Sequence, residues 1–320
     1  MARKTHLIDG DGPLEAVDRA AIEERLKTST FFWLDLHGPD ETDVALLNDV
    51  FHLHSLAVED AEHFGQRAKL DEYDGFVLLV AFGANADEDN LVEVHCFLSE
   101  NYLVTVHHDD CPSFADVRTR IKREHAATGN GALLLYYIVD ALTDSFFPVL
   151  AEFDDRIDAL EDRVFEKPDD SQLQELFGMK RTLVSLRKAI SPQRDLFARI
   201  ATGVVAIPGL TTDVERYYRD VYDHMIRISD LVDSYRDLMS GAMDVYLSTV
   251  SNRLNDVMKK LTIIATIFLP LSWLTGYFGQ NLGFMVGHIG GVTGFLVLGV
   301  GAPVAMVMGL LWLFKKRGWL

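Results

Sequence analysis

Positive charge is scarce in this sequence. Its 320 residues include 30 lysines and arginines against 48 aspartates and glutamates, which gives a formal net charge of -18. Short basic clusters flank the apolar segments, and the negative net charge disfavours a nucleic-acid partner, so we expect none. The acidic surplus is compatible with attraction of cations, although it more often marks a solvated surface.

Cysteines are few, and nucleotide-binding motifs are missing. Cys96 and Cys111 cannot make a disulfide framework, and they fit a reduced compartment. There is no Walker loop, and the glycines of residues 287–294 lie at an apolar segment instead of following a strand as in a dinucleotide-binding motif. We therefore expect a protein that is not an enzyme and does not hydrolyse nucleotides.

Long apolar runs are confined to the C-terminal region. The N-terminal segment MARKTHLIDGDGPLE has no apolar core of the kind found in signal peptides, whereas residues 261–278 and 292–314 are almost entirely apolar. Lys259 and Lys260 precede the first run, and the basic tail at 315–320 follows the second. This pattern predicts two helices that cross the cell (inner) membrane, with both termini cytoplasmic and the loop at 282–291 outside.

A single long helix is predicted over residues 211–281. Thr212 and Glu215 have the spacing of a capping box, and no proline interrupts the helical pattern before Pro270. The helix therefore begins as an acidic cytosolic stalk and continues into the first membrane span.

Small and polar residues form a stripe along this helix. Steps of four and three residues connect Asp244, Ser248, Ser251, Asn255, Met258, Thr262, Ala265, Leu269, Ser272 and Gly276. Such a stripe is typical of close helix packing in membranes. Because Asp244 and Asn255 add a carboxylate and an amide, a water-filled path along a symmetry axis is favoured here. Two spans cannot enclose that path alone, so we expect a homo-oligomer.

The N-terminal part of the chain predicts two cytosolic regions and an α+β fold class. Residues 1–125 alternate apolar strands with helices, which indicates an α/β sandwich. Residues 126–210 have a helical period throughout and predict a long antiparallel helical hairpin. Strands are expected at 31–37, 76–82, 91–98 and 102–107, the last two joined by a tight turn, and helices at 41–51, 56–64, 133–165 and 172–189.

Several of these segments resemble one known family. They are SNRLNDVMKKLTIIATIFLPLSWLTGYFGQN and KKRGWL at the apolar runs, YYRDVYDH on the long helix, and HSLAVEDAEHFGQRAKLDEYDGF and VDALTD in the N-terminal part. Together they resemble the CorA-type family of magnesium and divalent-cation transporters, within the CorA/ZntB-like superfamily. The resemblance covers nearly the whole chain. It implies a funnel-shaped homopentamer in membrane lipid, with the first span of each subunit lining the pore.

The resemblance also implies pore residues. The family's outer mouth is a Gly-Met-Asn triplet, which corresponds to Gly279, Gln280 and Asn281, so the middle residue departs from the family. Amide and carbonyl oxygens at this mouth would hold a hydrated magnesium ion. An apolar constriction is expected at Met258 and Leu261. The remaining pore positions are Ser272 and Thr262 of the stripe, a polar ring at Asn255 and a cytoplasmic entrance at Asp244.

Regulatory cation binding between cytosolic domains is a further property of the family. By resemblance, Asp60 lies against Asp220 of the neighbouring subunit, and Glu59 and Asp140 are secondary ligands. Carboxylates are the oxygen ligands that Mg²⁺ prefers. From the residues alone these positions are typical of solvated charges, so this regulatory Mg²⁺ site depends on the resemblance.

The leading hypothesis is a passive channel for magnesium, with Co²⁺ or Ni²⁺ as further substrates, gated by intracellular cation. A Zn²⁺ transporter of the ZntB-like branch, with or without proton coupling, is the first alternative, favoured by Gln280 and the uncharged outer loop. The second alternative is a membrane-tethered cation sensor that conducts nothing. Histidine-containing groups are weaker candidates for binding zinc, and chance clustering explains them better: His52 with His54, His107 and His108 with Asp109 and Asp110, and His288.

Overall fold

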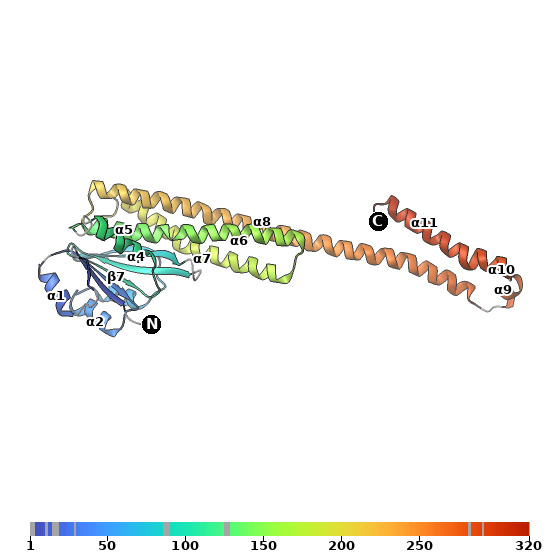
Figure 1. Cartoon of the computed structure of the whole chain (residues 1–320), viewed down its shortest axis with the longest axis horizontal. Helices are drawn as coiled ribbons and strands as arrows, with labels where there is room; N and C mark the ends of the chain where they lie inside the picture. Colours follow the sequence, from blue (N-terminus) through green and yellow to red (C-terminus); the bar gives the residue numbers. More distant parts are fainter. Residues whose placement is uncertain are drawn as a thin grey trace. The chain divides into compact units, whose positions relative to one another are not determined.

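The computed structural model describes residues 4–9, 12–14, 19–28, 30–85, 90–124, 129–280, 283–289 and 291–319. The chain divides into two compact units, Met1–Met243 and Asp244–Leu320, called here the N-terminal unit and the C-terminal unit (Figure 1). The long helix α8 (Thr212–Phe278) contributes residues to both.

A seven-stranded sheet, with the order β2-β1-β3-β7-β6-β5-β4, forms the centre of the N-terminal unit as far as its residues are described. β3 and β7 pair in parallel, and the other described neighbours are antiparallel. The strands are β1 (Lys4–Asp9), β2 (Gly12–Leu14), β3 (Phe32–His37), β4 (Lys69–Tyr73), β5 (Phe76–Asn85), β6 (Asn90–Leu98) and β7 (Tyr102–His107). All positions of β5 are buried, which is typical of an apolar strand covered on both faces.

The four predicted strands are confirmed as β3, β5, β6 and β7, and a tight turn joins the last two. The sequence pattern does not indicate β4. This strand reads KLDEY, lies at the edge of the sheet and has half-exposed side chains, so it lacks the apolar run that marks a buried strand.

Helices cover both faces of the sheet. Because side chains alternate along a strand, adjacent residues of β3 show both layers. The ring centroid of Phe32 lies 6.3 Å from that of Phe51, which follows α2, whereas that of Trp33 lies 5.6 Å from Phe114 in α4. The predicted α/β sandwich is therefore confirmed. One layer contains α1 (Arg19–Thr28), α2 (Glu41–Asp49) and α3 (Ser55–Glu62), and the other contains α4 (Ser113–Glu124) and α5 (Gly131–Asp144) (Figure 1).

The single helix predicted at 133–165 is wrong. α5 ends at Asp144, and α6 (Phe146–Glu166) begins after Ser145. Pro148 has no N–H to bond the carbonyl of Asp144, and the hydroxyl of Ser145 donates to the carbonyl of Leu142 at 2.5 Å. A proline three residues into α6 therefore favours an interruption where the apolar pattern alone predicts continuity.

The predicted helical hairpin is formed by α6 and α7 (Asp170–Ala201). Nη2 of Arg163 lies 2.8 Å from Oε2 of Glu175, so an ion pair bridges the two helices. α7 is longer than the predicted 172–189, because it continues through Pro192. Gln193, Phe197 and Ile200 extend its buried face beyond the proline, so tertiary packing maintains the helix.

Side chains from these helices complete the sheet where its edge strand ends. β4 pairs with β5 only as far as Val80. Beyond that point, Oε1 of Gln193 accepts from the N–H of Phe82 at 2.6 Å, and Nε2 of Gln193 donates to the carbonyl of Phe82 at 3.0 Å. The hydroxyl of Ser145 accepts from the N–H of Ala84 at 2.8 Å. Backbone groups of β5 that β4 does not reach are therefore hydrogen-bonded by α7 and by the junction of α5 and α6.

The predicted capping role of Thr212 is wrong by one residue. Thr212 is the first residue of α8, and Oγ1 of Thr211 accepts from the N–H of Val214 at 3.4 Å. The carbonyl of Thr211 also accepts from the N–H of Glu215 at 2.9 Å. Two adjacent threonines offer the same capping chemistry, so spacing alone does not distinguish them.

The C-terminal unit contains the end of α8 and a second apolar helical stretch. The segment predicted as a loop at 282–291 includes the short helix α9 (Gly283–His288). α10 (Gly291–Gly294), the π-helix η2 (Phe295–Gly301) and α11 (Ala302–Lys316) form one helical stretch from Gly291 to Lys316. Pro303 lacks an N–H, and the N–H of Ala302 bonds the carbonyl of Val297 five residues earlier, which is the wider π pattern.

Three helical segments among the described residues are long and apolar enough to cross a membrane: Gly131–Glu166, Thr212–Phe278 and Gly291–Lys316. In the first segment 61% of the apolar window is buried inside the protein, whereas the windows of the other two are 0% buried. The apolar residues of α5 are therefore packed in the core of the N-terminal unit.

Candidate functional site

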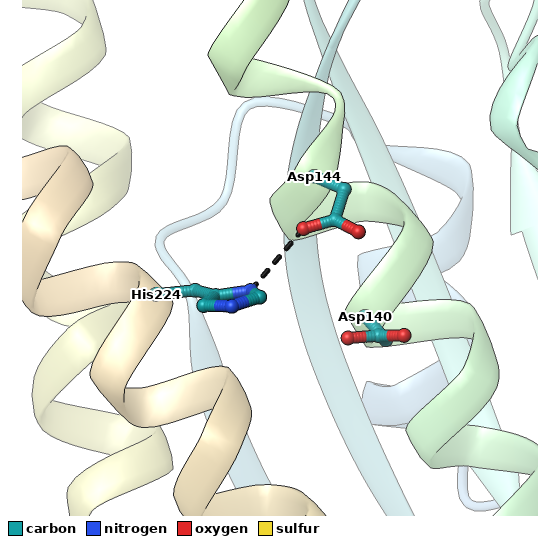
Figure 2. A group of neighbouring side chains, drawn as sticks. All are labelled: Asp140, Asp144 and His224. Carbon is teal, nitrogen blue, oxygen red and sulfur yellow. Dashed lines mark ion pairs between the residues drawn. The ribbon is translucent and has the colours of Figure 1, made fainter.

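Three possible metal ligands meet where α5 ends beside α8. Asp140 and Asp144 lie one turn apart on α5, and His224 extends toward them from α8 (Figure 2). One ligand atom from each residue lies within 4.8 Å of the other two. Nδ1 of His224 is 3.2 Å from Oδ1 of Asp144. We call these three residues the Asp140 cluster.

A guanidinium is also bonded to Asp140. Nη1 of Arg120, on α4, donates to Oδ2 of Asp140 at 3.0 Å. Burial and then the charge of Asp144 raise the pKa of Asp140 above its ordinary value, while the bond from Arg120 lowers it and partly offsets them. Two carboxylates placed this close are stabilised in their charged form by a cation between them.

A cavity of about 440 Å³ lies beside the cluster, and Asp116, Arg120, Asp140 and Asp144 are among its lining residues. Carboxylate oxygens are the ligands that Mg²⁺ prefers, and Mg²⁺ usually keeps several waters, for which this cavity has room. The imidazole of His224 suits Co²⁺, Ni²⁺ and Zn²⁺ better. The donor set therefore fits a divalent cation without selecting one metal.

Asp220 lies on the exposed side of α8, in a depression of about 620 Å³ that Tyr136, Asp213, Arg216 and Tyr217 also line. Burial, the charge of Asp140 and, more weakly, that of Asp220 raise the pKa of Tyr136 to about 12. The charges of two carboxylates therefore act on Tyr136: that of Asp140 in the Asp140 cluster and that of Asp220 on the exposed side of α8.

Glu59 and Asp60 lie on α3, where Glu59 is exposed and Asp60 is half-buried. Nζ of Lys69 is 2.6 Å from Oδ2 of Asp60 and 2.9 Å from Oδ2 of Asp71. Asp60 is thus paired with a lysine of its own chain. Its approach to Asp220 of the neighbouring subunit stays a prediction.

Asp140 is predicted as a metal ligand from the sequence, but neither Asp144 nor His224 is. The spacing of Asp140 and Asp144 in VDALTD places both on one face of a helix, and this signal was available in the sequence. Nothing in YYRDVYDH indicates which element His224 contacts, because its partners are about 80 residues away along the chain. Arg120 has no sequence signal of its own.

The polar stripe of α8 faces away from the second apolar stretch. All ten stripe residues are exposed, including Leu269 at 76%. The half-buried residues Ile263, Ile267, Leu274 and Phe278 lie on the opposite face, roughly 180° away at about 100° per residue. Leu274 and Phe278 line a cavity of about 410 Å³ together with residues of η2. Ile267 therefore lies on the face that packs within the chain.

The predicted mouth begins where α8 ends. The N–H of Gly279 bonds the carbonyl of Thr275 at 2.9 Å, and that of Gln280 bonds the carbonyl of Tyr277 at 3.4 Å, so both residues continue the last helical turn. Asn281 lies outside the described residues. The filter assignment of all three residues stays a prediction.

The other candidate histidines have local roles. Nδ1 of His54 accepts from the N–H of Leu56 at 3.2 Å and caps α3. Nε2 of His107 lies 3.2 Å from Oδ1 of Asp35, and its Nδ1 lies 2.7 Å from the carbonyl of Asp109. In the part of the chain that the structure describes, the Asp140 cluster is the group of three possible metal ligands whose ligand atoms lie within 4.8 Å of one another.

Comparison with known proteins finds relatives of the whole chain. The family model described as CorA-like Mg2+ transporter protein matches residues 28–316. The cobalt/magnesium transport protein CorA of Thermotoga maritima is 37% identical over 301 residues, which cover 92% of this chain and 84% of that protein. The zinc transport protein ZntB of Yersinia enterocolitica is 28% identical over 323 residues, which cover 99% and 95%.

A solved structure has the same fold. The complete structure of the CorA magnesium transporter from Methanocaldococcus jannaschii matches with a TM-score of 0.83 and 21% sequence identity, covering 100% of both chains. The mixed α/β unit and the long helices are therefore shared across that length.

Proposed function

This chain belongs to the family of CorA-like Mg2+ transporter proteins, and we propose that it conducts magnesium, with cobalt or nickel, through a homopentameric channel closed by intracellular cation. Family membership makes it a transporter of divalent cations. Which metal is conducted, how many subunits assemble and how the channel is gated are the parts of this function that we propose.

Two of the three apolar segments are proposed to cross the cell membrane. Gly131–Glu166 is excluded because most of its apolar window is buried inside the protein. Nζ of Lys259, before the first span, donates to the carbonyl of Gly318, after the second, at 3.1 Å. Both basic flanks therefore lie at one end of the C-terminal unit, which supports a two-span hairpin with both termini in the cytoplasm.

The stripe of α8 is the observation that carries the proposed pore. Its ten residues are exposed on the face opposite the second span, so they are available to line an axis shared with other subunits. Along that axis, Asn255 and Ser272 supply polar groups, and Met258 and Leu261 supply an apolar constriction that can close by dewetting. Two charges that cross 100 mV inward gain about 4.6 kcal/mol, at about 2.3 kcal/mol per charge, so no pump is required.

Gating is proposed to depend on cation bound to the N-terminal unit. The Asp140 cluster offers two carboxylates and an imidazole, and Asp60 with Glu59 would approach Asp220 of the neighbouring subunit. Carboxylates in such positions repel one another unless a cation lies between them. Internal magnesium would therefore hold the subunits together, and its loss would loosen the cytosolic end of α8.

Zinc transport is the second candidate function. Gln280 replaces the methionine expected at the mouth, His224 adds a ligand suited to zinc, and ZntB is among the relatives. A sensor that conducts nothing finds no support, because the relatives reported above are named as transport proteins.

Uptake by liposomes that contain the purified protein tests these candidates. Magnesium uptake that needs only an electrical gradient is expected, with zinc uptake much slower. Zinc uptake that requires a pH gradient would favour the second candidate, and the absence of flux for both metals would contradict both.

A further inference from the structure

Arg120 is held in place at the Asp140 cluster. Its Cζ atom lies 4.1 Å from the ring centroid of Tyr137 and 5.7 Å from that of Tyr136. Nη1 donates to Oδ2 of Asp140 at 3.0 Å, and the Asp140 side chain is only 13% exposed. An arginine on a solvated surface usually gains little from one carboxylate, whereas two aromatic faces and a nearly buried acceptor fix this guanidinium.

Asp140 therefore contacts two regions of different charge. Its Oδ2 accepts from the guanidinium of Arg120. A ligand atom of Asp140 also lies within 4.8 Å of ligand atoms of Asp144 and His224, the three residues drawn in Figure 2. A divalent cation bound to the cluster would share Asp140 with Arg120. Like charges at such separations repel appreciably inside a protein, because the effective dielectric constant is far below that of water.

We propose that Arg120 is an internal counterion that sets the cation concentration at which the Asp140 cluster fills. In the ion-free state it neutralises part of the charge of the two carboxylates and keeps the cluster assembled. When a divalent cation binds, the same positive charge weakens the binding. The inference deepens the proposed gating site and depends on that site binding a cation.

Removing the charge of Arg120 should therefore tighten cation binding. Full-length protein in detergent is treated with a protease at increasing Mg²⁺, and in a second series at increasing Co²⁺, and the concentration that gives half-maximal protection is measured. For Arg120→Met we expect this midpoint to fall about tenfold, which corresponds to about 1.4 kcal/mol. Arg120→Lys, which keeps the charge, should remain close to the wild type.

Arg118 provides the matched control on the same helix. It pairs with Asp35 at 3.2 Å instead of with the cluster, so Arg118→Met changes the net charge equally without touching Asp140. The cation concentration that gives half-maximal protection of Arg118→Met should equal that of the wild type. A fall of the same size in both variants would show that overall charge, and not the contact with Asp140, controls the affinity.

Asp144→Asn separates this inference from the proposed function. If Asp144→Asn leaves the midpoint unchanged, the cluster is not a gating site, and the role of Arg120 is wrong with it. If Asp144→Asn abolishes protection while Arg120→Met has an unchanged or higher midpoint, the site stands and the role of Arg120 is wrong. Arg120→Gln, which keeps an N–H donor for Asp140 without the charge, gives the same test should the methionine variant not fold.

Discussion

Nζ of Lys69 lies 2.6 Å from Oδ2 of Asp60, so the carboxylate predicted to bind cation at a subunit boundary already has a cation beside it. Lys69 also pairs with Asp71 at 2.9 Å and is therefore shared between two carboxylates. Its single charge does not neutralise Asp60 fully. A regulatory magnesium between Asp60 and Asp220 of the neighbouring subunit would consequently bind to a pair of reduced negative charge.

Replacement of Asp220 by lysine tests this boundary. Asp220→Lys should mimic bound cation by pairing with Asp60 of the neighbouring subunit, so the assembly should resist protease and remain closed when magnesium is removed. Asp230→Lys, which makes the same charge change at another exposed position of α8, should keep the wild-type dependence. If Asp220→Lys is as sensitive to magnesium as the wild type in both proteolysis and transport, the sensor lies elsewhere.

Asn281→Ala should abolish magnesium uptake in liposomes while leaving the oligomer intact. The change removes a ring of hydrogen-bond acceptors for the hydrated ion without burying any group. Oligomeric state is measured by size-exclusion chromatography with light scattering on the same preparation. Uptake near the wild-type rate would exclude a filter role for Asn281.

Ser272→Trp should block conduction by placing an indole on the stripe. The matched control is Ile264→Trp, because Ile264 is 55% exposed and lies roughly 120° from the centre of the stripe, at about 100° per residue. Ile267 is unsuitable as a control, since it packs within the chain. Both variants are compared by uptake rate per assembled channel. Equal losses of flux would show that the stripe does not face the pore.

Gln193→Leu should lower the free energy of unfolding by about 2 kcal/mol or more. The substitution leaves both backbone groups of Phe82 buried without their partner, and each such group costs about 1–3 kcal/mol. Thr143→Val is the control, because buried Thr143 bonds only a sulfur, Sδ of Met225, at 3.7 Å among the contacts described. Thermal unfolding in detergent measures both. A similar small shift for the two variants would mean that Gln193 does not act through the sheet edge.

His107 should make stability fall as the pH rises above neutrality. Burial would lower its pKa, but the hydrogen bond and charge of Asp35, with the carbonyl of Asp109, raise the pKa above its ordinary value of 6.5. A raised pKa in the folded state stabilises the protein fully below pH 6.5, and this contribution is lost as the pH passes through the raised value. Asp35→Asn should therefore be less stable in acid and should lack this slope in thermal unfolding at a series of pH values.

The sequence predicts the parts of this protein whose stability is local or strongly apolar. β5 and the two apolar helical segments of the C-terminal unit follow from apolar runs, whereas the orientation that Lys259 and the basic tail indicate stays a prediction. The pattern does not reveal β4, because its charged residues pair at a sheet edge, or the break at Ser145, because a buried apolar pattern continues across it. The candidate site is predicted only in part. Asp140 and Asp144 share a helical face in any fold, whereas His224 and Arg120 join them through tertiary packing of α8 and α4.

The bond between Lys259 and Gly318 gives the protein an intrinsic optical reporter. Trp319 follows Gly318 directly, and its ring stacks on Phe314 with centroids 5.9 Å apart and planes inclined by 12°. Movement of α8 at Lys259 would disturb the carbonyl of Gly318 and, with it, the surroundings of this indole. The fluorescence of Trp319, isolated by replacing the other three tryptophans with phenylalanine, would then follow the movement of α8 at Lys259 in real time.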